Sequence, residues 1–225
     1  MSKKKSKRRF FIITAASILV LLMVGGGGIA LMMGNEQKQM TPLDNSEIIP
    51  GIFAVRNGFV NIFLVKSNNG YIAIDAGVNV PQTEEGMEQL GIASDSVSAV
   101  LLTHSHGDHT GALKVFNKAK IYAANSSIAD KSLADGEIFE VGGLQIQVIS
   151  TPGHAEDSVC FLIDERFLFV GDNLSLVDGK VGLFNSVYNN SDEKQKKDIQ
   201  KLAGLSGIEY IFTAHYGFSD KAVFP

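Results

Sequence analysis

The 24 residues from Phe10 to Met33 contain no charged side chain, and six Lys or Arg residues precede them between Lys3 and Arg9. A helix of that length spans roughly 36 Å, more than the ~30 Å hydrocarbon core of a bilayer. Helices buried in globular domains seldom stay uncharged for so long beside a polybasic segment. The sequence therefore predicts a transmembrane helix or signal anchor at residues 10–33, preceded by a basic cytoplasmic tail at residues 1–9.

A cleaved signal peptide is the alternative for the same segment, because Gly28-Ile29-Ala30 offers small residues at a cleavage site. The apolar run continues through Leu31-Met32-Met33, which favours an uncleaved anchor. Lys and Arg beside a span resist translocation, so we expect a single-pass protein of the cell membrane whose remaining chain is extracytoplasmic, or secreted if cleaved near Ala30. Residues 34–47 are polar and aperiodic, and we interpret them as a linker.

Charge divides the chain at about the same place. Residues 1–40 hold seven Lys or Arg and one Asp or Glu, whereas residues 41–225 hold 13 and 23, a net charge of −10. A surface this acidic repels phosphate backbones, so we expect no nucleic-acid partner. The single cysteine, Cys160, excludes a disulfide framework and a zinc finger built from cysteines.

Short apolar runs alternate with turn signals and helical stretches from Ile48 to the C-terminus. Asn57-Gly58 stands between two apolar runs and is a hairpin signal. The predicted strands cover residues 52–55, 59–65, 71–74, 99–102, 121–124, 137–141, 144–149, 159–163, 167–170 and 210–212. Predicted helices cover 82–90 and 192–205, and another begins at 112–116. Two groups of strands with helices between them indicate one layered domain at residues 48–225.

Three of the five histidines fall within the six residues His104-Ser105-His106-Gly107-Asp108-His109. The first two are two residues apart at the end of a predicted strand, so they face the same side and can bind one cation. The glycine is expected to let the backbone turn sharply, so that the Asp-His pair points at a second cation. Imidazole and carboxylate are natural ligands of Zn²⁺ and similar metals. The alternative is a loop of solvated histidines.

Three further candidate metal ligands also follow predicted strands: His154, Asp172 and His215. Taken singly, each has an ordinary explanation as a surface or turn residue. Taken together, they complete a pattern in which all five histidines sit at strand ends, where scaffolds present functional groups.

The order H-x-H-x-D-H, His, Asp, His over about Gly51 to Tyr216 resembles the metallo-β-lactamase superfamily, and Ile74-Asp75-Ala76-Gly77 is similar to its first motif. The resemblance implies an α+β fold, a four-layer αββα sandwich with the site at one edge between the sheets. It also implies two Zn²⁺ ions, with Fe or Mn as alternatives. The implied ligands are His104, His106 and His154 for one ion, Asp108, His109 and His215 for the other, and Asp172 for both. Asp75 would orient a ligand imidazole from outside the ligand set.

Two such dications about 3.5–4 Å apart lower the pKa of a bridging water until hydroxide forms near neutral pH. Asp108 is the candidate catalytic residue, because it can coordinate and also take the proton. We therefore expect a membrane-anchored dinuclear hydrolase that uses a metal-bound hydroxide to cleave an ester, thioester, lactone or related bond in a small molecule. Asp172 stands where certain β-lactamase members have cysteine, which is closer to the glyoxalase II and lactonase branch.

Three departures from the family pattern concern the substrate and one ligand. Glu156 and Asp157 follow His154 and place acids at the rim, and Ala214-His215-Tyr216 stands where the family has Gly-His-Gly. Ten residues follow His215, so we expect substrate contacts from the Asn57-Gly58 hairpin and from Leu174–Asn190, which includes two aromatic residues.

Alternative functions remain at this point. One is a mononuclear iron dioxygenase that oxidises sulfur compounds on the same scaffold, which would lack the second set of ligands. The others are a β-lactamase and a metal-binding domain without turnover.

Overall fold

The computed structural model describes residues 40–220 and 224–225, and one compact unit runs from Thr41 to Pro225. The predicted cytoplasmic tail, the transmembrane segment and the first part of the linker lie outside the described residues. Strand β1 (Ser46–Ile49) begins within the segment interpreted as a linker. Among the described residues, no helix combines the length and the apolarity needed to cross a bilayer.

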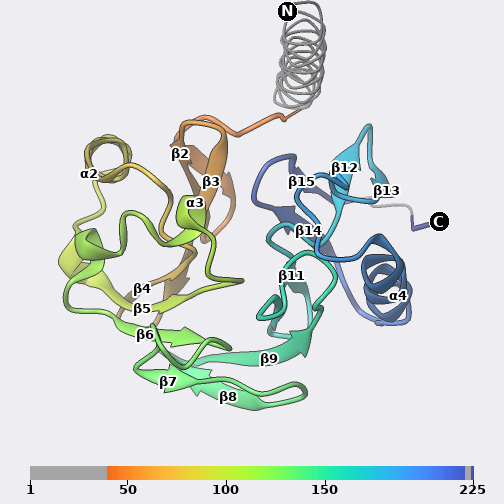
Figure 1. The fold of residues 1–225 in the computed structure, drawn as a ribbon. Helices are drawn as coiled ribbons and strands as arrows, with labels where there is room; N and C mark the ends of the chain where they lie inside the picture. The colour runs from red at the N-terminus through yellow and green to blue at the C-terminus, as the bar shows by residue number, and fades with distance from the viewer. Residues whose placement is uncertain (1–39, 221–223) are drawn as a thin grey trace, which may run out of the picture. The chain divides into compact units, whose positions relative to one another are not determined.

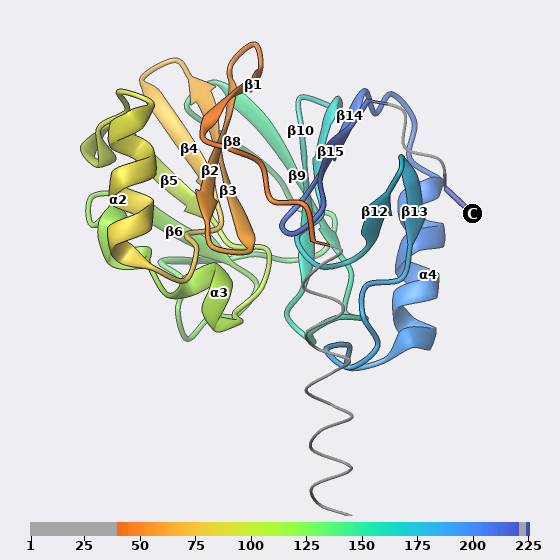
Figure 2. The same cartoon turned by 90° about the horizontal axis from the view of Figure 1, so that it is seen from above.

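Two β-sheets pack face to face, with α2 (Val80–Gln89) outside one sheet and α4 (Asp192–Ala203) outside the other (Figures 1 and 2). The first sheet has the order β1, β2 (Ile52–Asn57), β3 (Val60–Ser67), β4 (Gly70–Ile74), β5 (Val97–Leu101), β6 (Lys120–Ala123), β7 (Lys131–Ser132). The second has the order β15 (Gly217–Ser219), β14 (Tyr210–Thr213), β11 (Phe167–Phe169), β10 (Val159–Ile163), β9 (Leu144–Ser150), β8 (Ile138–Val141). The predicted αββα sandwich is confirmed.

Alternation along the strands explains the layers. In β3, Phe63 and Val65 belong to the core between the sheets, whereas Ile62 and Leu64 belong to the core beneath α2. A strand of the first sheet is therefore apolar on both faces, because each face packs against another layer. The second sheet contributes Phe161, among other residues, to the core between the sheets.

Parallel pairing brings several strand ends to one edge. β4 pairs in parallel with β5 after the α2 crossover, and β11 pairs in parallel with β14, with α4 between them in the sequence. Parallel neighbours need such long connections, and their carboxyl ends meet at the same edge of the sheet. The loops after β4, β5, β11 and β14 therefore gather there.

One predicted helix is wrong. Residues 107–116 form only the four-residue helix α3 (Gly107–Thr110) and a 3₁₀ turn at Leu113–Phe116. The amide of Ala112 donates to the carbonyl of Gly77 rather than within a helix. A Cβ at Gly111 would lie 2.7 Å from the carbonyl oxygen of Val78, so the chain here packs against a neighbouring loop instead of continuing as a helix.

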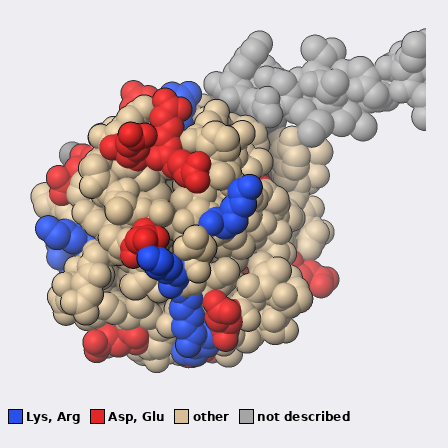
Figure 3. Space-filling view, turned by 90° about the vertical axis from the view of Figure 1, so that its left-hand side faces the viewer, with Lys and Arg blue, Asp and Glu red and all other residues tan. Residues whose placement is uncertain are grey.

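Acidic side chains are exposed along α2, where Glu84, Glu85 and Glu88 point to solvent. On the face that Figure 3 draws, Asp and Glu groups lie beside Lys and Arg groups without a continuous basic patch. This face offers no broad positive surface for a phosphate backbone.

Candidate metal centre

The seven predicted ligands come together in two groups. Their ligand atoms lie within 4.8 Å of one another in each group, one formed by His104, His106 and His154 and the other by Asp108, His109, Asp172 and His215. Asp172 Oδ2 lies 3.5 Å from Nε2 of His154 and 3.4 Å from Nε2 of His109. One carboxylate therefore borders both groups.

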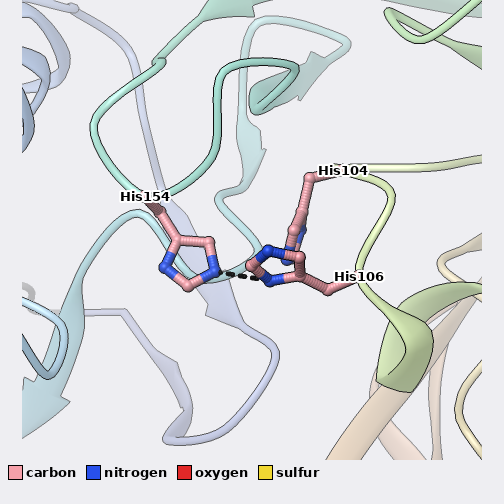
Figure 4. Close-up of side chains that lie close together, drawn as sticks. All are labelled: His104, His106 and His154. Carbon is pink, nitrogen blue, oxygen red and sulfur yellow. Dashed lines mark hydrogen bonds between the residues drawn. The ribbon is translucent and has the colours of Figure 1, made fainter. Parts of the chain in front are cut away.

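The first group joins two loops that are far apart in the sequence. His104 and His106 follow β5, whereas His154 lies in the loop between β9 and β10 (Figure 4). Nδ1 of His106 and Nε2 of His154 are 3.1 Å apart, so two ring nitrogens converge on one small region. His104 and His154 are buried and His106 is exposed, which leaves the group open to solvent on one side.

Gly107 does not make the sharp backbone turn that the sequence predicted. Its φ is outside the left-handed region, and a Cβ there would meet nothing within 4 Å. The turn that needs glycine is instead at Gly171, before Asp172. Gly171 has φ +56°, and a Cβ there would lie 2.5 Å from Oγ1 of Thr103.

In the second group, the Nδ1 atom of each histidine has an oxygen acceptor beside it. His215 Nδ1 donates to the carbonyl oxygen of Phe59 at 2.8 Å, and His109 Nδ1 lies 2.8 Å from Oδ2 of Asp75. A proton on Nδ1 leaves the Nε2 lone pair free to coordinate. The structure thus places Asp75 beside the imidazole of His109, one of the predicted ligands.

The first-group histidines have neutral partners. His104 Nδ1 lies 3.1 Å from Oγ1 of Thr103, and His154 Nδ1 lies 3.1 Å from Oδ1 of Asn189. These two partners were missed by the sequence analysis, as was the Phe59 carbonyl. An isolated Thr or Asn has no spacing that distinguishes it from other polar residues.

Three buried atoms of the centre lack hydrogen-bond partners within the described part of the chain: His104 Nε2, His109 Nε2 and Asp172 Oδ1. Each buried polar atom left unpaired costs roughly 1–3 kcal/mol, and native proteins keep few of them. Here they are imidazole and carboxylate atoms that face one another. That donor set fits divalent cations such as Zn²⁺.

Burial and mutual charge set the protonation of these groups. Burial, aided by the nearby His109, holds the pKa of His104 well below its usual value, and burial also lowers the pKa of His154. Burial opposes protonation of His109 as well, but the carboxylates of Asp75 and Asp172 outweigh it and raise the pKa well above normal. Asp172 likewise outweighs burial to raise the pKa of His215.

The charges around the shared carboxylate favour its ionised form. Burial favours the neutral acid, yet His215 and His109 outweigh it and hold the pKa of Asp172 well below its usual value. A buried carboxylate at the border of two imidazole groups is a natural bridging ligand.

The comparisons with known proteins agree with this geometry. Residues 55–124 match the family model of the metallo-beta-lactamase superfamily. The lactamase-like protein ptaB of Pestalotiopsis fici is 33% identical over 159 residues, which are 63% of this chain and 51% of that protein. The atrochrysone carboxyl ACP thioesterase of Aspergillus chevalieri is 35% identical over 133 residues, 56% of this chain and 42% of that protein. The chain thus spans about half the length of the curated relatives it matches.

Solved structures show the same fold. A metallo-beta-lactamase family protein of Thermus thermophilus superposes with a TM-score of 0.63 at 21% identity, over 78% of this chain and 77% of that one. A metallo-beta-lactamase of Cronobacter sakazakii gives a TM-score of 0.63 at 21% identity, over 80% of each chain. The matched segment and the fold are those of the metallo-β-lactamase superfamily, as the histidine motif predicted.

Proposed function

We propose that the protein is a metal-dependent hydrolase that cleaves a thioester or a related acyl bond in a small molecule. The observation that carries this proposal is the meeting of two imidazole-carboxylate groups at Asp172, with three buried ligand atoms that have no other partner among the described residues. Relatives named as atrochrysone carboxyl ACP thioesterases support the choice of a thioester.

The residues that would hold the metals are those of the two groups. His104, His106 and His154 would hold one ion, Asp108, His109 and His215 the other, and Asp172 both. Zn²⁺ suits this donor set best, with Fe and Mn as alternatives. Such a pair of ions polarises a carbonyl oxygen and makes water nucleophilic near neutral pH.

Asp108 is the residue best placed to move a proton. Its side chain is 23% exposed, whereas that of Asp172 is 4% exposed. Its Oδ2 lies 3.5 Å from Nε2 of His215, at the border between the buried ligands and solvent. We assign Asp108 as the general base, because a carboxylate there can reach both the centre and water.

Apolar residues beside the centre would contact the acyl part of the substrate. The ring of Phe59 stacks on that of His215 with the centroids 5.6 Å apart, and Phe59 is 36% exposed. Val187, in the segment predicted as a substrate wall, is 50% exposed. Phe184 is buried against His154 and His215, so it supports the ligands rather than the substrate. The exposed ring of Phe59 beside His215 suits an apolar acyl group.

The assembled second group favours a two-metal hydrolase over a mononuclear iron dioxygenase. Metal-loaded full-length protein should hydrolyse acyl thioesters in a panel that also contains lactones, phosphodiesters and β-lactams. Asp108→Asn should lower kcat by at least tenfold with little change in KM. Oxygen consumption with a thiol substrate, in place of hydrolysis, would contradict the proposal.

We also propose that residues 10–33 hold the protein in the cell membrane with the catalytic domain outside the cytoplasm. The charge-free run and the six preceding basic residues support this topology. The protein should stay in the membrane fraction after alkaline carbonate washing, and protease added to intact cells or spheroplasts should degrade a C-terminal tag. Recovery of the intact chain in the soluble fraction would contradict it.

A further inference from the structure

Residues at the start of α4 form hydrogen bonds with the loop that carries His154. The backbone amide of Asn190 donates to the carbonyl of His154 at 2.9 Å, and that of Ser191 donates to the carbonyl of Gly153 at 2.9 Å. The amide of Gly153 in turn donates to Oδ2 of Asp198 at 2.7 Å. Three hydrogen bonds therefore join this loop to the start and the middle of α4.

Asn189 extends this connection to the ligand ring itself. Its Oδ1 lies 3.1 Å from Nδ1 of His154, on the side of the ring away from the metal centre. Its Nδ2 donates to the carbonyl of Phe184 at 3.1 Å and to Oε1 of Gln195 at 2.9 Å. The amide is thus held in one orientation, with its oxygen toward the histidine.

Gln195 is fully buried and uses both ends of its side chain. Its Nε2 donates to Oδ1 of Asn189 at 3.0 Å and to the carbonyl oxygen of Asp172 at 3.3 Å. Its Oε1 accepts from the amide of Phe184 at 2.9 Å and from Nδ2 of Asn189. One side chain therefore connects the support of His154 to the backbone of the shared carboxylate.

Helix capping does not account for these contacts. Ser191 is the N-cap of α4, and its side chain accepts from the amide of Lys194. Gln195 lies one turn further along and bonds to none of the free amides of that helix end. A buried, fully bonded glutamine instead fixes the geometry of the groups it joins.

We propose that Asn189 and Gln195 are positioning residues of the metal centre, a statement that rests on the metal site of the proposed function. Asn189 keeps the proton of His154 on Nδ1 and its Nε2 aimed at the first ion. Gln195 holds Asn189 in place and aligns the main chain of Asp172. The histidines of the second group are held by Asp75 and Phe59 instead, so loss of Asn189 weakens the first ion selectively.

Zinc titration of the metal-free, full-length protein tests this inference. Wild-type protein should bind two ions per chain. Asn189→Ala should weaken one of them about 10- to 100-fold and leave the other unchanged. Gln195→Ala should do the same and also weaken the second ion, because it contacts Asp172. Gln200→Ala is the matched control, since its side chain is exposed on α4, and it should titrate like wild type.

A conservative variant separates positioning from simple stability. Asn189→Asp keeps an acceptor for His154 Nδ1 but loses the bonds of Nδ2 to Gln195 and Asp192, so it should restore part of the affinity for the first ion, whereas Asn189→Leu should restore none. The Tm of each metal-free variant reports folding independently of metal.

Two outcomes would overturn the inference in distinguishable ways. If wild type binds two ions and Asn189→Ala binds both with wild-type affinity, while only the metal-free Tm falls, these residues are structural. If wild type itself binds no zinc, the proposed metal site fails and this inference fails with it.

Discussion

Asp75 joins the two ligand groups through Thr103. One carboxylate oxygen, Oδ2, lies 2.8 Å from Nδ1 of His109 and accepts the hydroxyl of Thr103 at 2.9 Å. That hydroxyl oxygen is in turn 3.1 Å from Nδ1 of His104, in the other group. Asp75 adopts φ 60°, a region that non-glycine residues seldom occupy, and such strain is retained where it aims a functional side chain.

The consequence is that Asp75→Ala should affect both groups. It leaves the Nδ1 proton of His109 and the amide of Thr103 without their acceptor in a buried place, so we expect a loss of about 1–3 kcal/mol in the free energy of unfolding. Zinc affinity should fall about 10- to 100-fold. Asp75→Gly relieves the backbone strain but also lacks the carboxylate, so it should recover part of the stability and none of the affinity. Urea unfolding and zinc titration measure both, and wild-type affinity in Asp75→Ala would refute the orienting role.

Gly153→Ala should disturb the contact between the His154 loop and α4. A Cβ at Gly153 would lie 2.3 Å from Cα and N of Gln195, where backbone must move. Overpacking of this kind costs about 1–3 kcal/mol. Gly107→Ala is the control, because a Cβ there meets no atom within 4 Å, and it should be as stable as wild type. Thermal unfolding distinguishes them, and equal Tm values would mean that the contact tolerates a side chain.

Lowering the pH should weaken the contribution of Asp135 to the free energy of unfolding. The amide of Ser150 and the ammonium of Lys201 hold the pKa of Asp135 below 3.8, its ordinary value. The folded state therefore favours the charged form, so the stabilisation is present above pH 3.8 and is lost as pH falls through the lowered pKa. The stability gap between wild type and Asp135→Asn should be small, because the pair is exposed, and should close with acidification. Urea unfolding from pH 6 to 3 measures this gap.

At Asp198, the stability difference between wild type and the Asn variant should change with pH in the opposite direction. Burial raises the pKa of Asp198 above 3.8, so the folded state binds its proton more tightly than the unfolded chain does. The cost of burying the charge is therefore present above the raised pKa and disappears as pH falls through it. Asp198→Asn keeps an acceptor for the amide of Gly153. Its free energy of unfolding should therefore rise relative to that of wild type as pH rises. Parallel stability profiles for wild type and variant would contradict this.

The sequence predicted the parts of the fold that rest on local pattern. The apolar run Val159–Ile163 is the buried strand β10, and the charged amphipathic segment at Asp192 begins α4 because Ser191 caps it. The short strands β12 (Ser175–Val177) and β13 (Lys180–Gly182) pair with each other in a separate two-stranded sheet. Three residues are too few to show an alternation, so their sequences carried no signal.

The residues of the two groups were found from the histidine cluster and from its resemblance to the metallo-β-lactamase superfamily, whereas the residues that support them were not. Histidine clusters are rare enough to stand out by spacing alone. Asn189 meets His154 from 35 positions away, and Gln195 meets the Asp172 carbonyl from 23 positions away. Such contacts depend on where α4 packs against the second sheet, which no local pattern specifies.

The number of metal ions bound to the full-length protein tests the central claim most directly. Mass-spectrometric metal analysis of zinc-loaded, gel-filtered protein should give two ions per chain for wild type. It should give about one for His106→Ala, which alters one group, and at most one weakly held ion for Asp172→Ala, which alters both. Glu140→Ala, on the exposed face of β8, should match wild type. Wild-type protein without stoichiometric metal, or the same content in all four proteins, would contradict the assignment.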